Sequence, residues 1–502
     1  MLSTIYNCNH KKFEAQIMKR RDFFLTATGA AVSTALPSLS HAQLASRRDV
    51  SYEPNRPLDS TGISIRDGNK ILKKGEKNNT APVLREEILD NPDAVFIIHA
   101  GIKTERDEKG QFTKCADQIE RFGRRAADLV FRQGTGKGGC TFIKPNMVGG
   151  LNKNRKTDYC HSGIVHPHFT VGMSDALHDM GNTNVAAGAR GALRHNQVVE
   201  SGLKDLLDTH DLPFIEAHVQ YFKDYRKNDL VWHDNPEGMV QRRFCTYKPV
   251  CQDGTTFINI AHAHTHKVGH TTLTLKNIQG IMPRGYGHIC DAWTSLDIWR
   301  KSIMDDFNSG YRRAIENSYI VHANKGYKYW DDGGYYRKYR GAGGYNAFKN
   351  AMKVHEKAGS DKREQALNNM IDIADTRLFW AEIWAQRMMD IIEVIPAPYV
   401  NMVEGVFARG HNGTVLGNFL TVGRNMAAVD AVSSWLMGHD PRELPYLRIA
   451  NERGIGENDI AKIPLYSLDE KGAKKIDDYR FLRQHHLGVY NLGLKEPGLR
   501  FF

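Results

Sequence analysis

The chain has 502 residues, of which 41% are hydrophobic and 25% are charged. These proportions are those of an ordinary folded protein with room for a large core, so they exclude disorder over the whole chain. The formal net charge of +11 favours anionic partners, but by itself it does not choose among nucleic acid, polyanionic glycans, lipid headgroups and small carboxylates.

The N-terminal segment 18–42, MKRRDFFLTATGAAVSTALPSLSHA, resembles a twin-arginine export signal. The pair Arg20–Arg21 precedes a modestly apolar run rich in Ala and Thr, and small residues end the segment as they do at a cleavage site. Met18 stands directly before this pattern, so a start of translation there, which would leave residues 1–17 untranslated, is an open alternative. A surface-anchored amphipathic helix is the alternative for the segment itself.

The expected location is therefore the periplasm or the outside of the cell, with the twin-arginine translocase as a partner during export. No other stretch reaches the roughly 18 apolar residues of a spanning helix, so no stable membrane span is expected after cleavage. Export also removes the protein from cellular nucleic acid, which we therefore do not expect as a partner.

An α/β domain is predicted over residues 91–465, after an irregular, polar N-terminal arm at 43–90. Apolar runs and helical spacing alternate along this part of the chain, which favours a mainly parallel sheet flanked by helices. The predicted strands are 93–101, 140–146 and 182–191, the predicted helices are 115–133 and 166–181, and further helix and strand patterns run through 212–219 and 255–266. The Gly-rich residues 134–139 are predicted to be a flexible turn, since they lack the order of a phosphate-binding loop.

An insertion is predicted at about 310–390. Its Tyr- and Gly-rich part, 324–345, interleaves seven aromatic residues with basic ones. Such a stretch could stack sugars, and the alternative is a loop packed on itself. Beyond it we expect a helical C-terminal part and then a tail, 466–502, packed on the domain.

Seven cysteines are present, and six of them follow residue 42. They are scattered and form no C-x-x-C pair, so no iron–sulfur cluster or zinc ribbon is expected. Free structural cysteines are the main expectation, with a pair between Cys245 and Cys251 as the alternative.

A histidine-rich motif, HAHTHKVGH, begins at His262 in the last predicted strand. Alternation along a strand places His262, His264 and His266 on one face, with neighbouring Cα atoms about 6.5 Å apart. Two such imidazoles can share a divalent transition metal, and the third needs a bend in the strand to reach the same ion. The three histidines are the predicted metal ligands. The alternative is a polar row that lines a substrate cleft or a sheet edge.

Further polar residues follow the predicted strands, where ligands of such sheets gather. An ammonium, a guanidinium or an amide there can hold a carboxylate or phosphate. The candidate ligand-binding residues are Lys144, Asn146, Lys276, Asn277 and Arg284, and the candidate catalytic residues are His288 and Glu404. Asp430 is also a late carboxylate, but its place in the first turn of a predicted helix already explains it through the helix dipole.

Three segments together resemble the family called domain of unknown function 362. They are FIKPNMV (142–148), NIAHAHTHKVGHTTLTLKNIQGIMP (259–283) and VGRNMAAVDAVSSWLMGHDPRELPYLRIANERGIG (422–456). The resemblance spans roughly residues 90–460, with the aromatic stretch as an insertion. The chain departs from it in two ways. Lysines often stand where this chain has His262 and His264, and the ferredoxin-like cysteine module of some relatives is absent.

The resulting hypothesis is an exported, metal-dependent enzyme that acts on an anionic small molecule or a glycan. The metal would polarise the substrate or activate water. The alternative is a non-catalytic binding protein for a glycan or polyanion, which would use the Tyr-rich stretch.

Overall fold

The structure, a computed structural model, describes residues 79–108, 112, 115–147, 163–189, 201–216, 230–235, 243–247, 250–251, 254–266, 269–282, 384–385, 387–410 and 413–482. The predicted export signal and the Tyr-rich stretch lie outside these residues, as do Arg284 and His288. Among the described residues no helix combines the length and apolar character that crossing a membrane requires.

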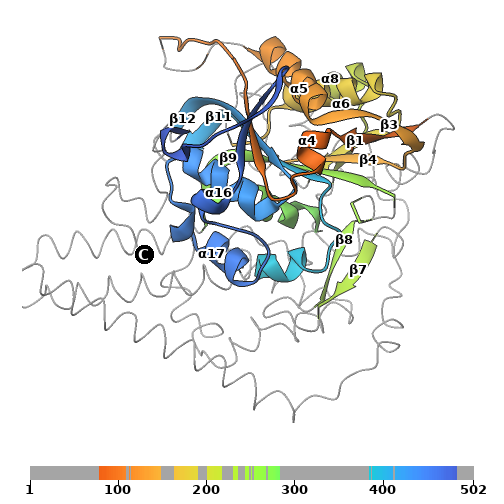
Figure 1. The fold of residues 1–502 in the computed structure, drawn as a ribbon. Helices are drawn as coiled ribbons and strands as arrows, with labels where there is room; N and C mark the ends of the chain where they lie inside the picture. The colour runs from red at the N-terminus through yellow and green to blue at the C-terminus, as the bar shows by residue number, and fades with distance from the viewer. Residues whose placement is uncertain are drawn as a thin grey trace, which may run out of the picture. The chain divides into compact units, whose positions relative to one another are not determined.

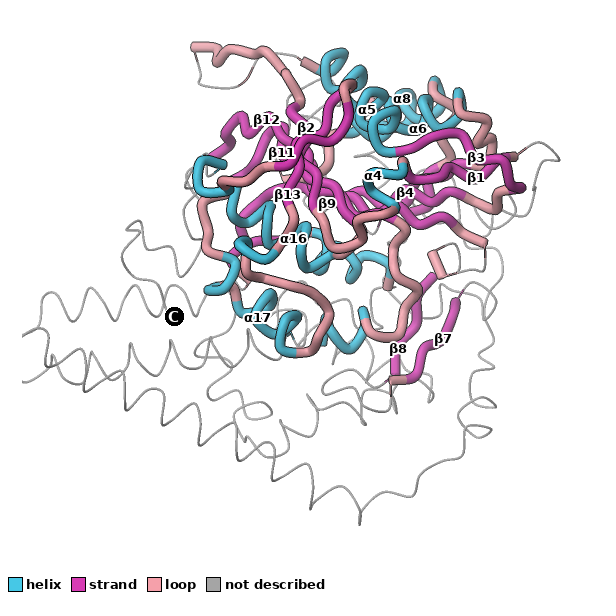
Figure 2. Tube along the Cα trace, in the orientation of Figure 1, coloured by secondary structure: helices cyan, strands magenta, loops and turns pink. Residues whose placement is uncertain are grey.

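A ten-stranded sheet lies at the centre of the described residues (Figures 1 and 2). Its strand order is β14-β13-β2-β12-β11-β9-β4-β5-β6, and β10 pairs with β9 off this path. The strands are β2 (Val95–His99), β4 (Thr141–Pro145), β5 (Val185–Ala189), β6 (Phe214–Glu216), β9 (Thr256–His266), β10 (His270–Thr272), β11 (Val400–Gly410), β12 (Gly413–Gly423), β13 (Leu465–Asp469) and β14 (Gly472–Lys475). The strands predicted at 93–101, 140–146, 182–191 and 255–266 are confirmed.

The prediction of a mainly parallel sheet is wrong, because the sheet is mixed. Strands β6, β5, β4, β9 and β11 run parallel to one another, but β12 is antiparallel to both β11 and β2, and β10 is antiparallel to β9. Only residues 411–412 separate β11 from β12, and a connection this short can join antiparallel strands only. The same holds for β13 and β14, which residues 470–471 connect.

Helices cover both faces of this sheet (Figure 1). One layer holds α5 (Ala116–Val130), α6 (Pro167–Asp179) and α8 (Leu203–Thr209), and the other holds α9 (Thr274–Asn277), η3 (Ile278–Ile281), α16 (Met426–Leu436) and α17 (Pro445–Glu452). Alternate residues of β9 belong to the two cores: Ile258 and Ile260 pack on the α5–α6 side, and Ala261 and Ala263 on the α16 side. This is the two-residue period of a strand buried on both faces.

Smaller elements surround the sheet. They are β1 (Thr80–Leu84), α4 (Glu86–Leu89), β3 (Phe131–Lys137), β7 (Leu230–Asp234), β8 (Arg243–Tyr247), η4 (Pro441–Glu443), η5 (Ile460–Lys462) and η6 (Tyr479–Leu482). The arm predicted to be irregular at 43–90 thus contains a strand and a short helix, and the tail predicted at 466–502 contributes strands to the edge of the main sheet.

Strand β3 corrects the prediction of a turn at 134–139. It pairs antiparallel with β1. A Cβ on Gly134 would lie 2.1 Å from Ala81 O, and one on Gly138 would lie 2.5 Å from Ala81 N. These glycines therefore serve the close approach of two backbones rather than a flexible turn.

The described cysteines differ partly from expectation. Cys140 and Cys251 are free thiols, so Cys251 is not paired with Cys245. Cys115, by contrast, is disulfide-bonded.

Two glycines hold α5 and α6 in close contact. A Cβ on Gly172 would lie 2.1 Å from Glu120 O, and one on Gly123 would lie 2.3 Å from Phe169 O. We expect Gly172→Ala to lower the free energy of unfolding by about 2 kcal/mol, because the helices must separate. Urea denaturation measures the loss, and Gly136→Ala, where a Cβ would have no atom within 4 Å, is the control. Equal stability of Gly172→Ala and the wild type would contradict the close packing.

Candidate functional site

The candidate site lies at the carboxyl ends of β4, β9 and β11, which are neighbours in the sheet. Strand β9 continues past the end of β4, since its last partner there is Ile260, opposite Pro145. His262, His264 and His266 all lie on this extension. The histidine motif therefore stands at the edge of the sheet where α/β proteins bind ligands.

His262 and Glu404 form a buried pair at the start of the extension. Parallel pairing of β9 and β11 sets the two residues opposite each other, and His262 Nδ1 lies 3.0 Å from Glu404 Oε2. His262 Nε2 accepts a hydrogen bond from Gly163 N at 2.7 Å, so the proton of a neutral ring stands on Nδ1 and is donated to the carboxylate. Glu404 Oε1 in turn accepts from Val406 N at 2.7 Å. Both nitrogens of His262 are thus engaged by protein groups.

His264 is the half-buried neighbour of this pair. Its Nδ1 donates to the His262 carbonyl at 3.2 Å, and the two rings lie 5.7 Å apart. Burial lowers the pKa of His264 well below its ordinary value, and the nearby His262, Lys276 and Arg409 lower it further. At neutral pH the ring is therefore neutral, and it stands beside two cationic side chains.

His266 turns to a different partner. Its ring stacks on Trp384 with centroids 5.5 Å apart, and its Nδ1 accepts from Gly269 N at 3.1 Å. The structure thus brings His262 and His264 together with Glu404 and places His266 against an aromatic ring. Metal binding by these three histidines stays a prediction.

The predicted ligand-binding residues Lys144 and Asn277 meet on the opposite face of the sheet. Lys144 Nζ donates to Asn277 Oδ1 at 2.7 Å, and Asn277 Nδ2 donates to Asn259 Oδ1 at 2.8 Å. Asn259 Nδ2 then donates to Asn401 Oδ1 at 2.9 Å. Strand register aligns Lys144 with Asn259 and Asn259 with Asn401, so this buried polar row crosses three strands. A Cβ on Gly280 would lie 2.8 Å from Lys144 Nζ, so the glycine leaves room for the ammonium.

The remaining predicted residue of this group, Asn146, is buried just after β4. Its backbone N–H donates to Ile260 O at 2.9 Å, and its carbonyl accepts from Val165 N at 2.8 Å. It joins the end of β4 to β9 and to the segment that leads into α6.

Asp430 has a role that the sequence did not indicate. It is fully buried in α16 and accepts hydrogen bonds from Thr274 N at 2.7 Å and Leu275 N at 3.0 Å. It therefore binds the start of α9 and does not cap its own helix. Burial raises its pKa to about 7, against the lowering effect of these hydrogen bonds.

A carboxylate–imidazole cluster on the α5–α6 side was also missed. Donor atoms of Glu120, Asp175 and His210 all lie within 4.8 Å of one another, close enough to hold a metal ion. Across the part of the chain that the structure describes, no other three Asp, Glu, His or Cys side chains meet this way. The residues come from three separate helical segments, and no local motif links them. None of the three residues is among the candidates that the sequence analysis selects.

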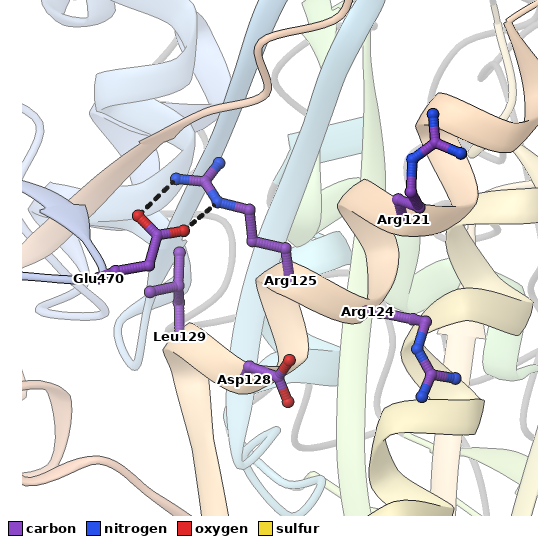
Figure 3. A pocket seen from close by; sticks show the side chains of 6 residues that line it. All are labelled: Arg121, Arg124, Arg125, Asp128, Leu129 and Glu470. Atoms are coloured by element: carbon purple, nitrogen blue, oxygen red, sulfur yellow. Dashed lines mark hydrogen bonds and ion pairs between the residues drawn. The ribbon is translucent and has the colours of Figure 1, made fainter.

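A shallow hollow of about 370 Å³ lies beside α5 (Figure 3). Its lining residues are Arg121, Arg124, Arg125, Asp128, Leu129 and Glu470. Arg125 donates to Glu470 through Nε at 2.5 Å and Nη2 at 3.3 Å, and this ion pair joins α5 to the turn between β13 and β14. Figure 3 shows Arg124 pointing away from this pair.

Comparison with known proteins yields one match. The model of the family described as a domain of unknown function (DUF362) matches residues 141–434. This range holds the histidine motif, Glu404, Lys144 and Asn277. No curated protein and no solved structure matches the chain.

Proposed function

The chain belongs to the DUF362 family, and on that premise we propose that it is an enzyme acting on an anionic small molecule or glycan at the carboxyl end of β9. The observation that carries the proposal is the buried His262–Glu404 pair beside His264, with Lys276 and Arg409 near enough to lower the pKa of that ring. The export segment 18–42 supports a working place in the periplasm or outside the cell, reached through the twin-arginine translocase.

Each side chain has a distinct part in this proposal. Lys276 and Arg409 attract and orient the anionic group of the substrate. His264 Nδ1 already donates a hydrogen bond to the His262 carbonyl, so Nε2 is the atom that accepts a proton from the substrate. Glu404 acts through His262, whose fixed ring holds this end of β9 in place, and it is a positioning residue.

An anion fits the surroundings of His264 better than a metal ion does. Two cationic side chains repel a divalent cation and attract an anion. The finer hypothesis, a divalent transition metal bound by His262, His264 and His266, is the competing form of the proposal. In that form at least one nitrogen of His262 exchanges its present partner for the metal.

The test begins with the exported form of the protein, made without a histidine tag. A thermal-shift screen covers phosphorylated and carboxylated small molecules and sulfated or uronic-acid oligosaccharides, and each hit is then assayed for turnover. We expect Lys276→Met and Arg409→Met each to weaken binding of the hit about tenfold or more. His264→Gln should keep binding and lower kcat by about 100-fold.

The matched control is Arg448→Met, an exposed arginine on α17 that pairs with Glu452. It should change neither binding nor kcat. Unchanged affinity in both the Lys276 and Arg409 variants would contradict the proposal. So would bound metal that is lost in His264→Ala, because that result assigns the site to a cation.

A further inference from the structure

We propose that Glu120, Asp175 and His210 form a binding site for a divalent transition-metal ion, separate from the β9 site. Glu120 belongs to α5, Asp175 belongs to α6, and His210 is the residue that ends α8. His210 Nδ1 lies 2.9 Å from Asp175 Oδ2, and its Nε2 lies 3.8 Å from Glu120 Oε2. One imidazole thus stands between two carboxylates from two different helices.

Close packing of α5 on α6 sets the spacing of the backbones that carry the two carboxylates. Gly172 lies three residues before Asp175, and its missing side chain lets α6 touch Glu120 O. Gly123, three residues after Glu120, lets α5 approach Phe169 O in the same way. The two ligands are therefore positioned by the closest part of the helix contact, and such preorganisation lowers the cost of binding a metal.

His168 is a hydrogen-bonded neighbour of the Glu120 carboxylate and is not one of the three proposed ligands. Its Nδ1 lies 2.7 Å from Glu120 Oε2, so it fixes the orientation of that carboxylate. It stands seven residues before Asp175 on α6, about two turns along the same face of the helix. A hydrogen-bonded partner of this kind behind a ligand is a usual feature of metal centres.

The exposure of the cluster suits a hydrated cation, whereas the charge of Arg124 opposes one. Arg124 Nη1 lies 3.4 Å from Asp175 Oδ2 and competes with a metal ion for this oxygen, while Nη2 of the same side chain donates to Asp179, outside the cluster. The side chains of His210, Asp175 and Glu120 are 16%, 21% and 28% exposed, so water can complete the coordination. Two carboxylate oxygens with one imidazole nitrogen favour Zn²⁺ or Mn²⁺ over Mg²⁺, which prefers oxygen ligands alone.

The test is calorimetric titration of the chelator-treated, untagged protein with ZnCl₂, MnCl₂ and MgCl₂. We expect one Zn²⁺ or Mn²⁺ ion per chain, a rise in Tm when it binds, and weaker binding of Mg²⁺. His210→Gln and Asp175→Asn should each weaken metal binding by about 100-fold. Arg124→Met should strengthen it several-fold, because a neighbouring positive charge is removed.

Two controls separate this site from its alternatives. His178→Gln changes another histidine on α6, one turn from Asp175, and should bind metal as the wild type does. His264→Ala should do the same, because its ring belongs to the β9 site. Failure of the wild type to bind metal would overturn the inference. So would wild-type affinity in both His210→Gln and Asp175→Asn, provided that their metal-free Tm matches that of the wild type, and so would loss of the metal in His264→Ala.

Discussion

Asn277→Ala is expected to lower the free energy of unfolding by about 4 kcal/mol. The Asn277 amide is the buried partner of Lys144 Nζ, and it also donates to Asn259 Oδ1 and to Ile260 O. Alanine removes these contacts and leaves a buried ammonium with one neutral acceptor fewer. Chemical denaturation measures the loss. Asn91→Ala, an exposed asparagine that donates only to Glu87 O, should cost less than about 0.5 kcal/mol.

A double-mutant cycle tests whether the ammonium causes most of this loss. Lys144→Met removes the charge and keeps a side chain of similar length. In that background we expect Asn277→Ala to cost about 2 kcal/mol less than it does in the wild type. Strictly additive losses would contradict the coupling and would assign the effect to the hydrogen bonds of Asn277 with the strands.

The second large effect is a pH dependence of stability caused by Asp430. Burial raises its pKa from 3.8 to about 7 in the folded protein. The folded state therefore holds this proton more tightly than the unfolded state does. The contribution of this proton to the unfolding free energy has its full value below pH 4 and is lost as the pH rises toward 7. Between pH 5 and pH 7 the contribution of Asp430 to the unfolding free energy should fall by about 2 kcal/mol.

Asp430→Asn isolates this contribution, because an amide does not titrate. The variant loses a favourable acceptor for Leu275 N, so it should be less stable than the wild type at pH 5. The difference between the two proteins should shrink by about 2 kcal/mol at pH 7. Denaturant titrations at both pH values measure it, with the exposed Asp93→Asn as a control whose difference from the wild type stays constant. A constant difference for Asp430→Asn would show that the carboxyl is ionised throughout this range.

Local pattern was enough to predict much of the sheet. Apolar runs located β2, β4, β5 and β9, and alternation correctly grouped His262 with His264. The direction of the later strands was missed, although the two-residue gap between β11 and β12 carried that information. Glycines in β3 were interpreted as a turn because a close contact between backbones leaves no periodic signal.

The partners of the candidate site residues could not be predicted in the same way. Glu404 was selected as a late carboxylate, but its contact with His262 depends on the register of two strands 142 residues apart. Lys144 and Asn277 were each expected to face a ligand, and instead they bind each other inside the protein. The Glu120 cluster joins three helical segments, and only the packing of α5 on α6 brings them together. Such contacts are tertiary, so no window of the sequence contains them.

The position of β2 in the sheet has a consequence for how the protein is made. This strand, at residues 95–99, has β12 and β13 as its neighbours, and those strands end at residues 423 and 469. During synthesis β2 therefore leaves the ribosome long before either neighbour exists, with two unpaired edges that other chains could join. Sheets closed by such distant pairs form slowly. The sheet is completed only when nearly the whole chain has been released. A chaperone that shields this early strand would thus protect the yield of folded protein.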